Sequence, residues 1–270
     1  MPASADIWPH SRTGWSKEKP EWTVPKTRLD TLLVERGLVA SRDRARALIL
    51  AGDVRVNGAV AAKAGTAVAR DAEVTLTTPD HPYVGRGGLK LAHALSVFDI
   101  DVTGRIGHDI GASTGGFTDV LLQHGALRVV ALDVGHSQLD WKLRSDSRVI
   151  TIERVNARNL APQDLPDEAR LFGIVTVDVS FISLRHILPV VPPLMAPGAD
   201  VVALVKPQFE ARRDEVGKGG IIRDDAVRTR VVEEVAAAAD TVGMTRVAVV
   251  ESPIAGMEGN RELLMHLRRK

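Results

Sequence analysis

The spacing of apolar residues changes near residue 83. Beyond it, short apolar runs that indicate buried strands alternate with segments whose apolar positions recur every three or four residues, the spacing of an amphipathic helix. Alternating strands and helices are typical of an α/β domain with a mostly parallel sheet. Within residues 247–268, two apolar runs are separated by a loop that contains Gly and Pro, so we expect an antiparallel strand pair appended to this sheet.

The segment before this joint has shorter elements. Leucines at near-helical spacing predict a first helix, and Ser41 is placed to cap a second one. Asn57 and Gly58 follow, and these are the residues that a type I′ hairpin turn favours. We therefore predict a small α+β domain with its linker at residues 25–83, followed by the α/β domain at residues 84–270.

Composition and charge narrow the class of protein. The 35 Lys and Arg residues nearly balance the 34 Asp and Glu residues, so a surface that binds nucleic acid would have to be local. The absence of cysteine excludes disulfides, thiolate nucleophiles and Cys-ligated metals, and we expect no metal site. The apolar runs are too short to span a membrane, and residues 1–24 lack the apolar segment of a signal peptide. We expect a cytoplasmic protein in which residues 1–24 form a mobile tail.

Residues 108–135 combine a strand, a glycine-rich turn, a helix and a second strand. Gly111, Gly115 and Gly116 place backbone N–H groups at a helix N-terminus, where the helix dipole favours electron-rich ligand atoms. The second strand ends at Asp133, 22 positions after Gly111, close to the separation of about 20 typical of an acidic residue that binds a ribose. The ligand is therefore expected to carry a ribose.

Three kinds of site contain a turn of this type. A dinucleotide-binding fold requires the spacing GxGxxG, which these glycines do not have. A hydrolase elbow requires GxSxG, which the residues around Ser113 match, and several histidines are available as a base, but a hydrolase does not account for Asp133. A pocket for S-adenosylmethionine uses every residue of the pattern, with Asp109 opening the turn and Asp133 holding the ribose.

Charged residues stand where an open α/β sheet binds its ligands. Two apolar runs end at Asp178 and Lys206, at the carboxyl edge of the predicted sheet. Lys90 lies near the start of a predicted helix, where a cation opposes the helix dipole, and a residue placed against local stability is more often placed for function. Glu262 lies at the start of the last predicted strand, and without further evidence it would be interpreted as an exposed carboxylate.

Basic residues gather in the small domain. Arg42 and Arg46 lie four positions apart on one side of the second helix, an arrangement that suits the phosphates of an RNA backbone. Residues 28–58 resemble the S4 domain, which occurs in proteins that engage structured ribosomal RNA. The residues expected to contact RNA are Arg28, Arg42, Arg46 and Arg55, together with Arg86 in the linker.

Six motifs from residue 86 onward, in the same order, resemble the TlyA family. They are "RGGLK", "DIGASTGGFTD", "DVGHSQL", "VDVSFISL", "LVKPQFE" and "SPIAGMEGNRE". The resemblance implies a class I Rossmann-like methyltransferase fold, with a mostly parallel seven-stranded sheet and an antiparallel last strand, behind an S4-like domain. It also implies 2′-O-methylation of cytidine ribose in ribosomal RNA of one or both subunits, with S-adenosylmethionine as the cofactor.

Members of this family use a Lys, Asp, Lys, Glu tetrad. Matching motif to motif assigns these roles to Lys90, Asp178, Lys206 and Glu262. Glu251 and Glu258 are alternatives for the last role, and Glu262 is preferred because it follows "GN", as the family's glutamate does. Lys206 is the preferred base for the ribose hydroxyl, and a lysine accepts a proton only when neutral. Burial or the nearby cation Lys90 would favour the neutral form of Lys206, whereas Asp178 would favour its charged form, and the sequence leaves this balance open.

The resemblance also implies which residues bind S-adenosylmethionine. Backbone atoms of the glycine turn would face its amino-acid end, Asp133 would hold its ribose, and Asn156 would lie beside the adenine. The expected cofactor contacts are Asp109, Gly111, Ser113, Gly115, Gly116, Phe117, Asp133 and Asn156.

The expected partner is ribosomal RNA or a ribosomal subunit, with no membrane and no required oligomer. Two other functions stay open from the sequence. A non-catalytic RNA-binding factor for ribosome assembly would keep the arginines without needing the lysines or the cofactor turn. A haemolysin-like, membrane-active protein is suggested by a label that TlyA relatives often carry, but the absence of membrane spans and of a secretion signal argues against it.

Overall fold

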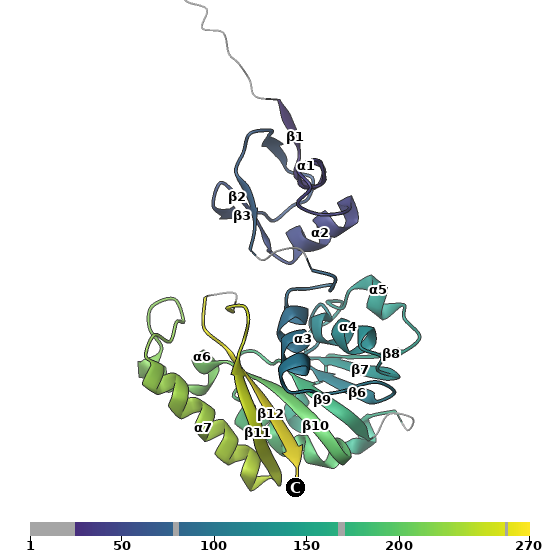
Figure 1. The fold of residues 1–270 in the computed structure, drawn as a ribbon, viewed down its shortest axis with the longest axis vertical. Coiled ribbons are helices and arrows are strands. Elements are labelled where there is room, and N and C mark those ends of the chain that lie inside the picture. Colours follow the sequence, from purple (N-terminus) through teal and green to yellow (C-terminus); the bar gives the residue numbers. More distant parts are fainter. Residues whose placement is uncertain (1–24, 78–80, 167–170, 257–258) are drawn as a thin grey trace, which may run out of the picture.

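The computed structural model describes residues 25–77, 81–166, 171–256 and 259–270. Within these ranges the chain forms a small domain and a larger α/β domain, joined by the segment around residue 83 (Figure 1). The expected tail at residues 1–24 and the alternative glutamate Glu258 lie outside the described residues. Among the helices of the described ranges, none combines the length and the apolar character needed to pass through a membrane.

In the small domain, two helices pack on short antiparallel strands. The elements are β1 (Lys26–Arg28), α1 (Leu29–Glu35), α2 (Arg42–Leu50), β2 (Val54–Val56), β3 (Ala59–Val60), β4 (Ala67–Ala69) and β5 (Val74–Leu76). Ser41 caps α2, because its Oγ accepts a hydrogen bond from the Arg44 backbone N–H at 3.1 Å. Asn57 and Gly58 have φ values of 49° and 80°, the left-handed pair of a type I′ turn. The cap and the hairpin were predicted, whereas β1, β4 and β5 were not.

The larger domain is built on one sheet of seven strands. These are β6 (Ile106–Ile110), β7 (Arg128–Asp133), β8 (Val149–Glu153), β9 (Phe172–Val177), β10 (Met195–Val205), β11 (Met244–Glu251) and β12 (Leu263–Arg269). Their order is β11-β12-β10-β9-β6-β7-β8, and β12 runs antiparallel to both of its neighbours while the other neighbouring pairs are parallel. The predicted sheet, with its antiparallel last strand, is confirmed.

Helices cover both faces of this sheet (Figure 1). The α-helices are α3 (Gly87–Val97), α4 (Gly116–Gln123), α5 (Trp141–Arg144), α6 (Pro207–Glu210) and α7 (Asp225–Thr241). Short 3₁₀ helices occupy Ala157–Asn159, Pro162–Asp164, Leu184–His186, Leu188–Val190, Pro192–Leu194 and Arg213–Glu215. Side chains of β7 alternate between two cores: Val129 packs with residues of α3, α4 and α5, and Val130 packs with residues of α7 and the 3₁₀ helices.

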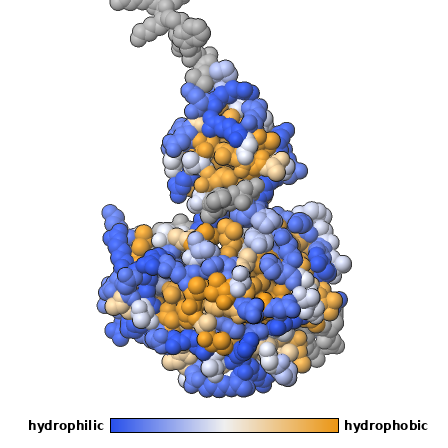
Figure 2. Space-filling view, viewed as in Figure 1, coloured by the Kyte–Doolittle hydropathy of each residue, from blue (hydrophilic) through white to orange (hydrophobic). Residues whose placement is uncertain are grey.

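The surface differs between regions of the molecule. Figure 2 shows apolar residues gathered in the middle of the face that carries β10 to β12, with hydrophilic residues around them and over the outer end of the small domain. One boundary also differs from the prediction. Since β12 begins at Leu263, Glu262 precedes the strand instead of lying just inside it, and its side chain is buried instead of exposed.

Candidate active site

A cavity of about 540 Å³ lies at the carboxyl edge of the sheet. It is formed where the chain leaves β6, β7, β8 and β9, which is where open α/β sheets bind ligands. Its polar lining comes from Gly111, Ser113, Asp133, Gln138, Asn156, Arg158, Asp178 and Ser180, and its apolar lining includes Val134, Val155, Phe181 and Ile182. Five of the residues expected to bind the cofactor or transfer the methyl group therefore face this one cavity.

The glycine turn is held close to the end of β9. Gly111 has φ +87°, and a Cβ at this position would lie 2.3 Å from the backbone oxygen of Asp178, so no larger residue fits. Ser113 also adopts a left-handed backbone, with φ 49°, and its N–H donates to Asp133 Oδ2 at 2.8 Å. The other carboxylate oxygen of Asp133 accepts from the Gly135 N–H at 2.6 Å. A carboxylate has about four acceptor positions, so Asp133 retains capacity for ribose hydroxyls.

Two of the expected cofactor residues lie beneath the cavity instead of lining it. Asp109 is fully buried, and its carboxylate accepts hydrogen bonds from the hydroxyls of Thr118 at 2.7 Å and Thr176 at 2.9 Å. Burial raises the pKa of Asp109 to about 6, although both hydroxyls oppose the rise. Phe117 is buried in the apolar core below the turn. Both residues support the turn from within the domain.

The remaining two glycines of the turn make room for protein atoms. A Cβ on Gly115 would lie 2.2 Å from Leu143 Cδ1, and a Cβ on Gly116 would lie 2.9 Å from the backbone nitrogen of Gly88. Gly88 belongs to α3, so Gly116 allows α3 and α4 to approach closely. The sequence pattern marks these positions correctly as requiring glycine, but it does not distinguish room for a cofactor from room for a neighbouring helix.

The four residues of the expected tetrad form two ion pairs. Lys206 Nζ lies 2.6 Å from Asp178 Oδ1 and donates to Ser180 Oγ at 2.9 Å. Lys90 Nζ donates to Glu262 Oε2 at 2.5 Å, and both of these side chains are buried. The charge of Lys90 is therefore offset by a carboxylate, so its repulsion of Lys206 is weaker than expected from the sequence.

The strand register brings the two ion pairs to the same place. Val205, the last residue of β10, pairs with Leu263, the first residue of β12. Because the two strands are antiparallel, Lys206 and Glu262 come directly after and directly before this pair, at the same edge of the sheet. The tetrad therefore converges at one edge, as the sequence predicts.

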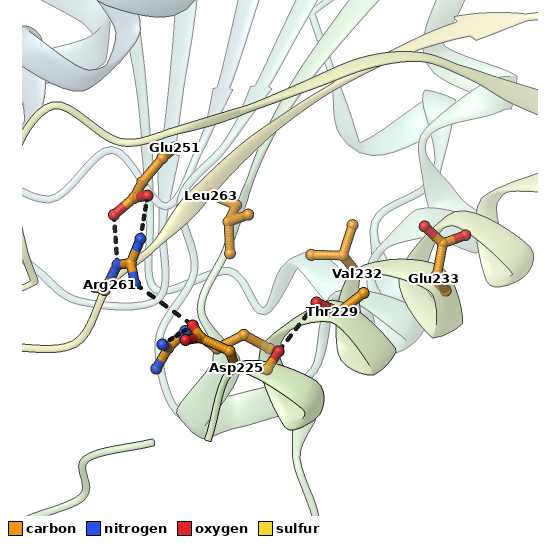
Figure 3. Close-up of a pocket in the computed structure, with 8 residues that line it drawn as sticks. Asp225, Thr229, Val232, Glu233, Glu251, Arg261 and Leu263 are labelled. Atoms are coloured by element: carbon orange, nitrogen blue, oxygen red, sulfur yellow. Dashed lines mark hydrogen bonds and ion pairs between the residues drawn. The ribbon is translucent and has the colours of Figure 1, made fainter. Parts of the chain in front are cut away.

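Glu251, the described alternative to Glu262, belongs to a separate cluster of charges. Its two oxygens accept hydrogen bonds from Arg261 at 2.7 Å and 2.6 Å, and its side chain is half exposed. Arg261 also lies 3.4 Å from Asp225 at the start of α7 (Figure 3). This hollow between α7 and the last two strands contains none of the lysines of the tetrad, which favours Glu262 as the glutamate.

Phe181 is a residue that the sequence reasoning missed. It lines the cavity, is 91% exposed, and has a left-handed backbone with φ 63°. Its ring is tilted against that of Phe209, with centroids 5.3 Å apart. A large aromatic ring in this backbone conformation is strained, and strain of this kind concentrates at functional sites. The sequence could have indicated this role, because Phe181 follows a buried strand and lies three residues after Asp178.

Three of the expected RNA-binding arginines surround one buried carboxylate. Arg28, Arg42 and Arg46 lie 2.8, 3.2 and 3.5 Å from Asp30 Oδ2. The hydrogen bond from Arg28 keeps the pKa of Asp30 well below its usual range, so the carboxylate stays charged. The three guanidinium groups are about half exposed, and Arg46 also lies 3.3 Å from the exposed carboxylate of Asp43. Three positive and two negative charges leave the cluster a surplus of one positive charge. This surplus of exposed positive charge suits phosphate oxygens.

The other two expected RNA contacts have different surroundings. Arg55 is exposed on the hairpin and donates to the Gly58 carbonyl at 3.0 Å. Arg86 is only 17% exposed, and it lies between the two domains, 3.7 Å from Asp53 of the small domain. Its guanidinium also donates to the carbonyl of Ala255, in the loop before β12. Arg55 is therefore accessible to RNA, whereas Arg86 is engaged by protein atoms.

The cavity residues fit S-adenosylmethionine. Asp133 supplies acceptors for the ribose, and the turn from Gly111 to Ser113 presents backbone groups in the left-handed conformation beside it. Apolar side chains such as Val134 and Ile182 form walls that suit an adenine ring. The side-chain oxygen of Asn156 accepts from the Arg158 N–H at 3.0 Å, which orients the Asn156 side chain at the cavity wall.

Comparison with known proteins gives consistent matches. The chain matches the FtsJ-like methyltransferase family over residues 83–269 and the S4 domain over residues 27–74. TlyA of Mycobacterium tuberculosis, named as a 16S/23S rRNA (cytidine-2'-O)-methyltransferase, is 46% identical over 90% of this chain and 90% of its own length. Hemolysin A of Brachyspira hyodysenteriae is 43% identical over 88% of this chain and 98% of its own.

A solved structure supports the same assignment. A protein from Streptococcus thermophilus, described as a candidate hemolysin, superposes with a TM-score of 0.72 at 45% identity, covering 92% of this chain and 90% of that one. FtsJ-like methyltransferases use S-adenosylmethionine, for which the cavity is suited. The fold, the two matched domains and the extent of sequence identity agree, and the chain belongs to the TlyA family of FtsJ-like methyltransferases.

Proposed function

We propose that this enzyme transfers a methyl group from S-adenosylmethionine to the ribose 2′-hydroxyl of a cytidine in ribosomal RNA. The observation that carries the proposal is the pairing of Lys206 with Asp178 and of Lys90 with Glu262 at the edge of a nucleoside-sized cavity. The names of the TlyA relatives support the choice of cytidine and of ribosomal RNA. The reaction would take place in the cytoplasm, where ribosomal subunits are available.

The cofactor would supply an electrophilic methyl group on its sulfonium. Asp133 would accept hydrogen bonds from its ribose, and the Gly111 turn would hold its amino-acid end. Asp178 lines the cavity and also pairs with Lys206, so it would connect the cofactor side of the site with the RNA side. Holding two reactants in line in this way lowers the entropic part of the activation barrier.

The ribose hydroxyl needs a proton acceptor to become a good nucleophile. Lys206 would take the hydroxyl proton on its amine nitrogen, which requires the neutral amine, as the methyl group passes from the sulfonium of the cofactor to the ribose oxygen. Asp178 and Ser180 fix the position of the Lys206 amine. Lys90 and Glu262, which face each other from α3 and the loop before β12, would orient the ribose.

RNA recognition would be shared between the two domains. The arginines around Asp30 would bind backbone phosphates, which fix position without reading sequence. A target nucleotide in paired RNA would have to leave its stack to bring the ribose to Lys206. The exposed ring of Phe181 at the cavity is suited to stack on such a base.

The direct test is transfer of tritiated methyl from S-adenosylmethionine to ribosomal subunits or naked ribosomal RNA, followed by mapping of the 2′-O-methyl position. We expect label at a cytidine ribose in one or both subunits. Label on a base, or no transfer to any ribosomal RNA, would contradict the proposal.

The double variant Arg42→Gln/Arg46→Gln should weaken RNA binding in a salt-dependent manner. Each lost phosphate contact reduces the slope of log K against log salt by about 0.9, so we expect a decrease of about 2 when both are replaced. Fluorescence anisotropy with a ribosomal RNA fragment, measured at several KCl concentrations, gives this slope. Arg28 still binds Asp30 through two hydrogen bonds in the variant, so the buried carboxylate keeps a partner.

Arg70→Gln is the matched control for this experiment. Arg70 is also half exposed in the small domain and is paired with Glu35 at 3.3 Å, as Arg46 is with Asp43, but it does not belong to the cluster around Asp30. We expect its slope to stay close to that of the wild type. Equal slopes for the wild type and the double variant would show that Arg42 and Arg46 do not bind phosphate.

A further inference from the structure

Asp53 is a buried carboxylate at the joint between the domains. It lies at the end of the turn that follows α2, its side chain is 2% exposed, and neither of its oxygens has a hydrogen-bond partner among the described residues. Burial raises the pKa of Asp53, and the nearby charges of Arg86 and Arg44 oppose this rise. A buried carboxylate without hydrogen bonds is costly to fold, so its presence calls for a compensating role.

Arg86 is the cation that Asp53 faces across the domain boundary. One of its terminal nitrogens lies 3.7 Å from Asp53 Oδ1, and the other donates to the Ala255 carbonyl. Arg86 directly precedes α3, so it comes one helical turn before Lys90, which binds Glu262. The start of α3 therefore holds the loop between β11 and β12 at two points, Ala255 and Glu262.

The loop between β11 and β12 contacts the side chain of Glu262 directly. A Cβ on Gly256 would lie 2.6 Å from Glu262 Oε1, so the backbone next to Ala255 packs against the carboxylate that binds Lys90. The Gly256 N–H also donates to the Asn260 carbonyl at 2.8 Å, which closes this part of the loop on itself. A shift of Ala255 away from Arg86 would thus move atoms that touch Glu262.

We infer that Asp53, from the RNA-binding domain, is a positioning residue for methyl transfer, because it holds Arg86 on the Ala255 carbonyl and so keeps Glu262 in place on Lys90. This inference rests on the proposed function for its kinetic consequences. It makes the geometry of the tetrad depend on how the small domain is docked, so that the domain that binds RNA also completes the site that modifies it.

A second contact keeps the domains together when Asp53 is altered. Arg44 of α2 donates to the backbone carbonyls of His81 at 2.5 Å and Tyr83 at 2.6 Å, in the linker. Replacing Asp53 with asparagine should therefore leave the small domain attached. It also leaves Arg86 without its ionic partner, so thermal unfolding is measured alongside the rate to separate a loss of stability from a loss of positioning.

The test is Asp53→Asn, assayed by single-turnover methylation of ribosomal RNA and by hydrogen exchange of the peptide that spans residues 252–262. We expect the methylation rate to fall about 10- to 100-fold, the range for a misplaced reacting group, and exchange in this peptide to become faster. Binding of S-adenosylmethionine should be unchanged. RNA affinity should be equal or higher, because the variant removes a negative charge from an RNA-binding domain.

Asp71→Asn is the control, because it makes the same charge change at an exposed position of the small domain. We expect neither its methylation rate nor its exchange to differ from the wild type. In a double-mutant cycle, Asp53→Asn combined with Arg86→Gln should lose no more rate than Arg86→Gln alone, since the two residues act through one contact.

The outcomes separate this inference from the proposed function. If the wild type transfers no methyl group to ribosomal RNA, the proposed function fails, while the exchange measurement still tests the contact. The inference is overturned if the wild type is active and Asp53→Asn has the same methylation rate and the same hydrogen exchange in residues 252–262 as the wild type. It is also overturned if the rate losses of Asp53→Asn and Arg86→Gln are additive in the double variant. Should Asp53→Asn fail to fold, Arg86→Gln with wild-type exchange in residues 252–262 would overturn it as well.

Discussion

Replacing Lys206 with alanine is expected to abolish methyl transfer while S-adenosylmethionine still binds. The variant loses the group that takes the ribose proton, and a positioned general base contributes about 10²- to 10⁴-fold to rate. The cavity is lined by the end of β7 and by the segments that follow β6, β7, β8 and β9, and Lys206 is not among the lining residues. Tritium transfer to ribosomal RNA measures the first effect, and equilibrium dialysis of the cofactor measures the second.

Two further variants make this result specific. Lys206→Arg keeps a positive charge beside Asp178 but cannot act as a base, since arginine stays protonated, so it should be inactive as well. Lys270→Ala removes a lysine that is also ion-paired, with Asp240 at 2.5 Å, at the opposite edge of the sheet, and should have wild-type activity. Wild-type turnover in Lys206→Arg would show that Lys206 only orients the substrate.

Replacing Gly111 with alanine should remove cofactor binding, with the dissociation constant rising at least about 100-fold. The added methyl group would lie 2.3 Å from the Asp178 carbonyl oxygen, a backbone atom that cannot rotate away. The end of β9 and the turn would have to separate, and this changes the cavity on both sides. A loss of this size corresponds to about 2.7 kcal/mol of binding free energy. Isothermal titration with S-adenosylhomocysteine or S-adenosylmethionine measures it.

Gly104→Ala is the matched control for the backbone strain. Gly104 has φ +70° in the turn before β6, but a Cβ there would meet no atom within 4 Å. Its substitution therefore costs stability of the order of 1 kcal/mol through strain alone and should leave cofactor affinity unchanged. If both glycine variants bind the cofactor like the wild type, the turn at Gly111 is not part of the cofactor site.

Local patterns predicted the sheet and the turn because each depends on a few neighbouring residues. The strand from Ile106 and the helix that ends before Gly125 follow from apolar spacing and from the left-handed residue that closes the helix, with φ 88°. The capped helix at Ser41 follows for the same reason. The short strands β4 and β5 were not predicted, since segments of three residues carry too little periodicity.

Contacts between distant parts of the chain were harder to predict. Motif matching correctly grouped Lys90 with Glu262, but the sequence does not show that this pairing offsets the charge expected to act on Lys206. The engagement of Arg86 by Asp53 depends on how two separately folded domains meet, and no local pattern encodes it. The burial of Asp109 and Phe117 beneath the turn was not predicted, because a motif match shows which residues belong to the site but not which side chains face the ligand.

The cofactor cavity and the tetrad differ in how far apart along the chain their residues lie. The lining of the cofactor cavity comes from residues 111–187, a nearly continuous stretch of strand–helix units. The contact of Lys90 with Glu262 spans 172 positions and forms only when β12 inserts between β10 and β11. Closing that longer loop costs more chain entropy and slows its formation. Three of the four tetrad residues lie outside the cavity lining, so cofactor occupancy would be a poor measure of how many molecules have an assembled tetrad.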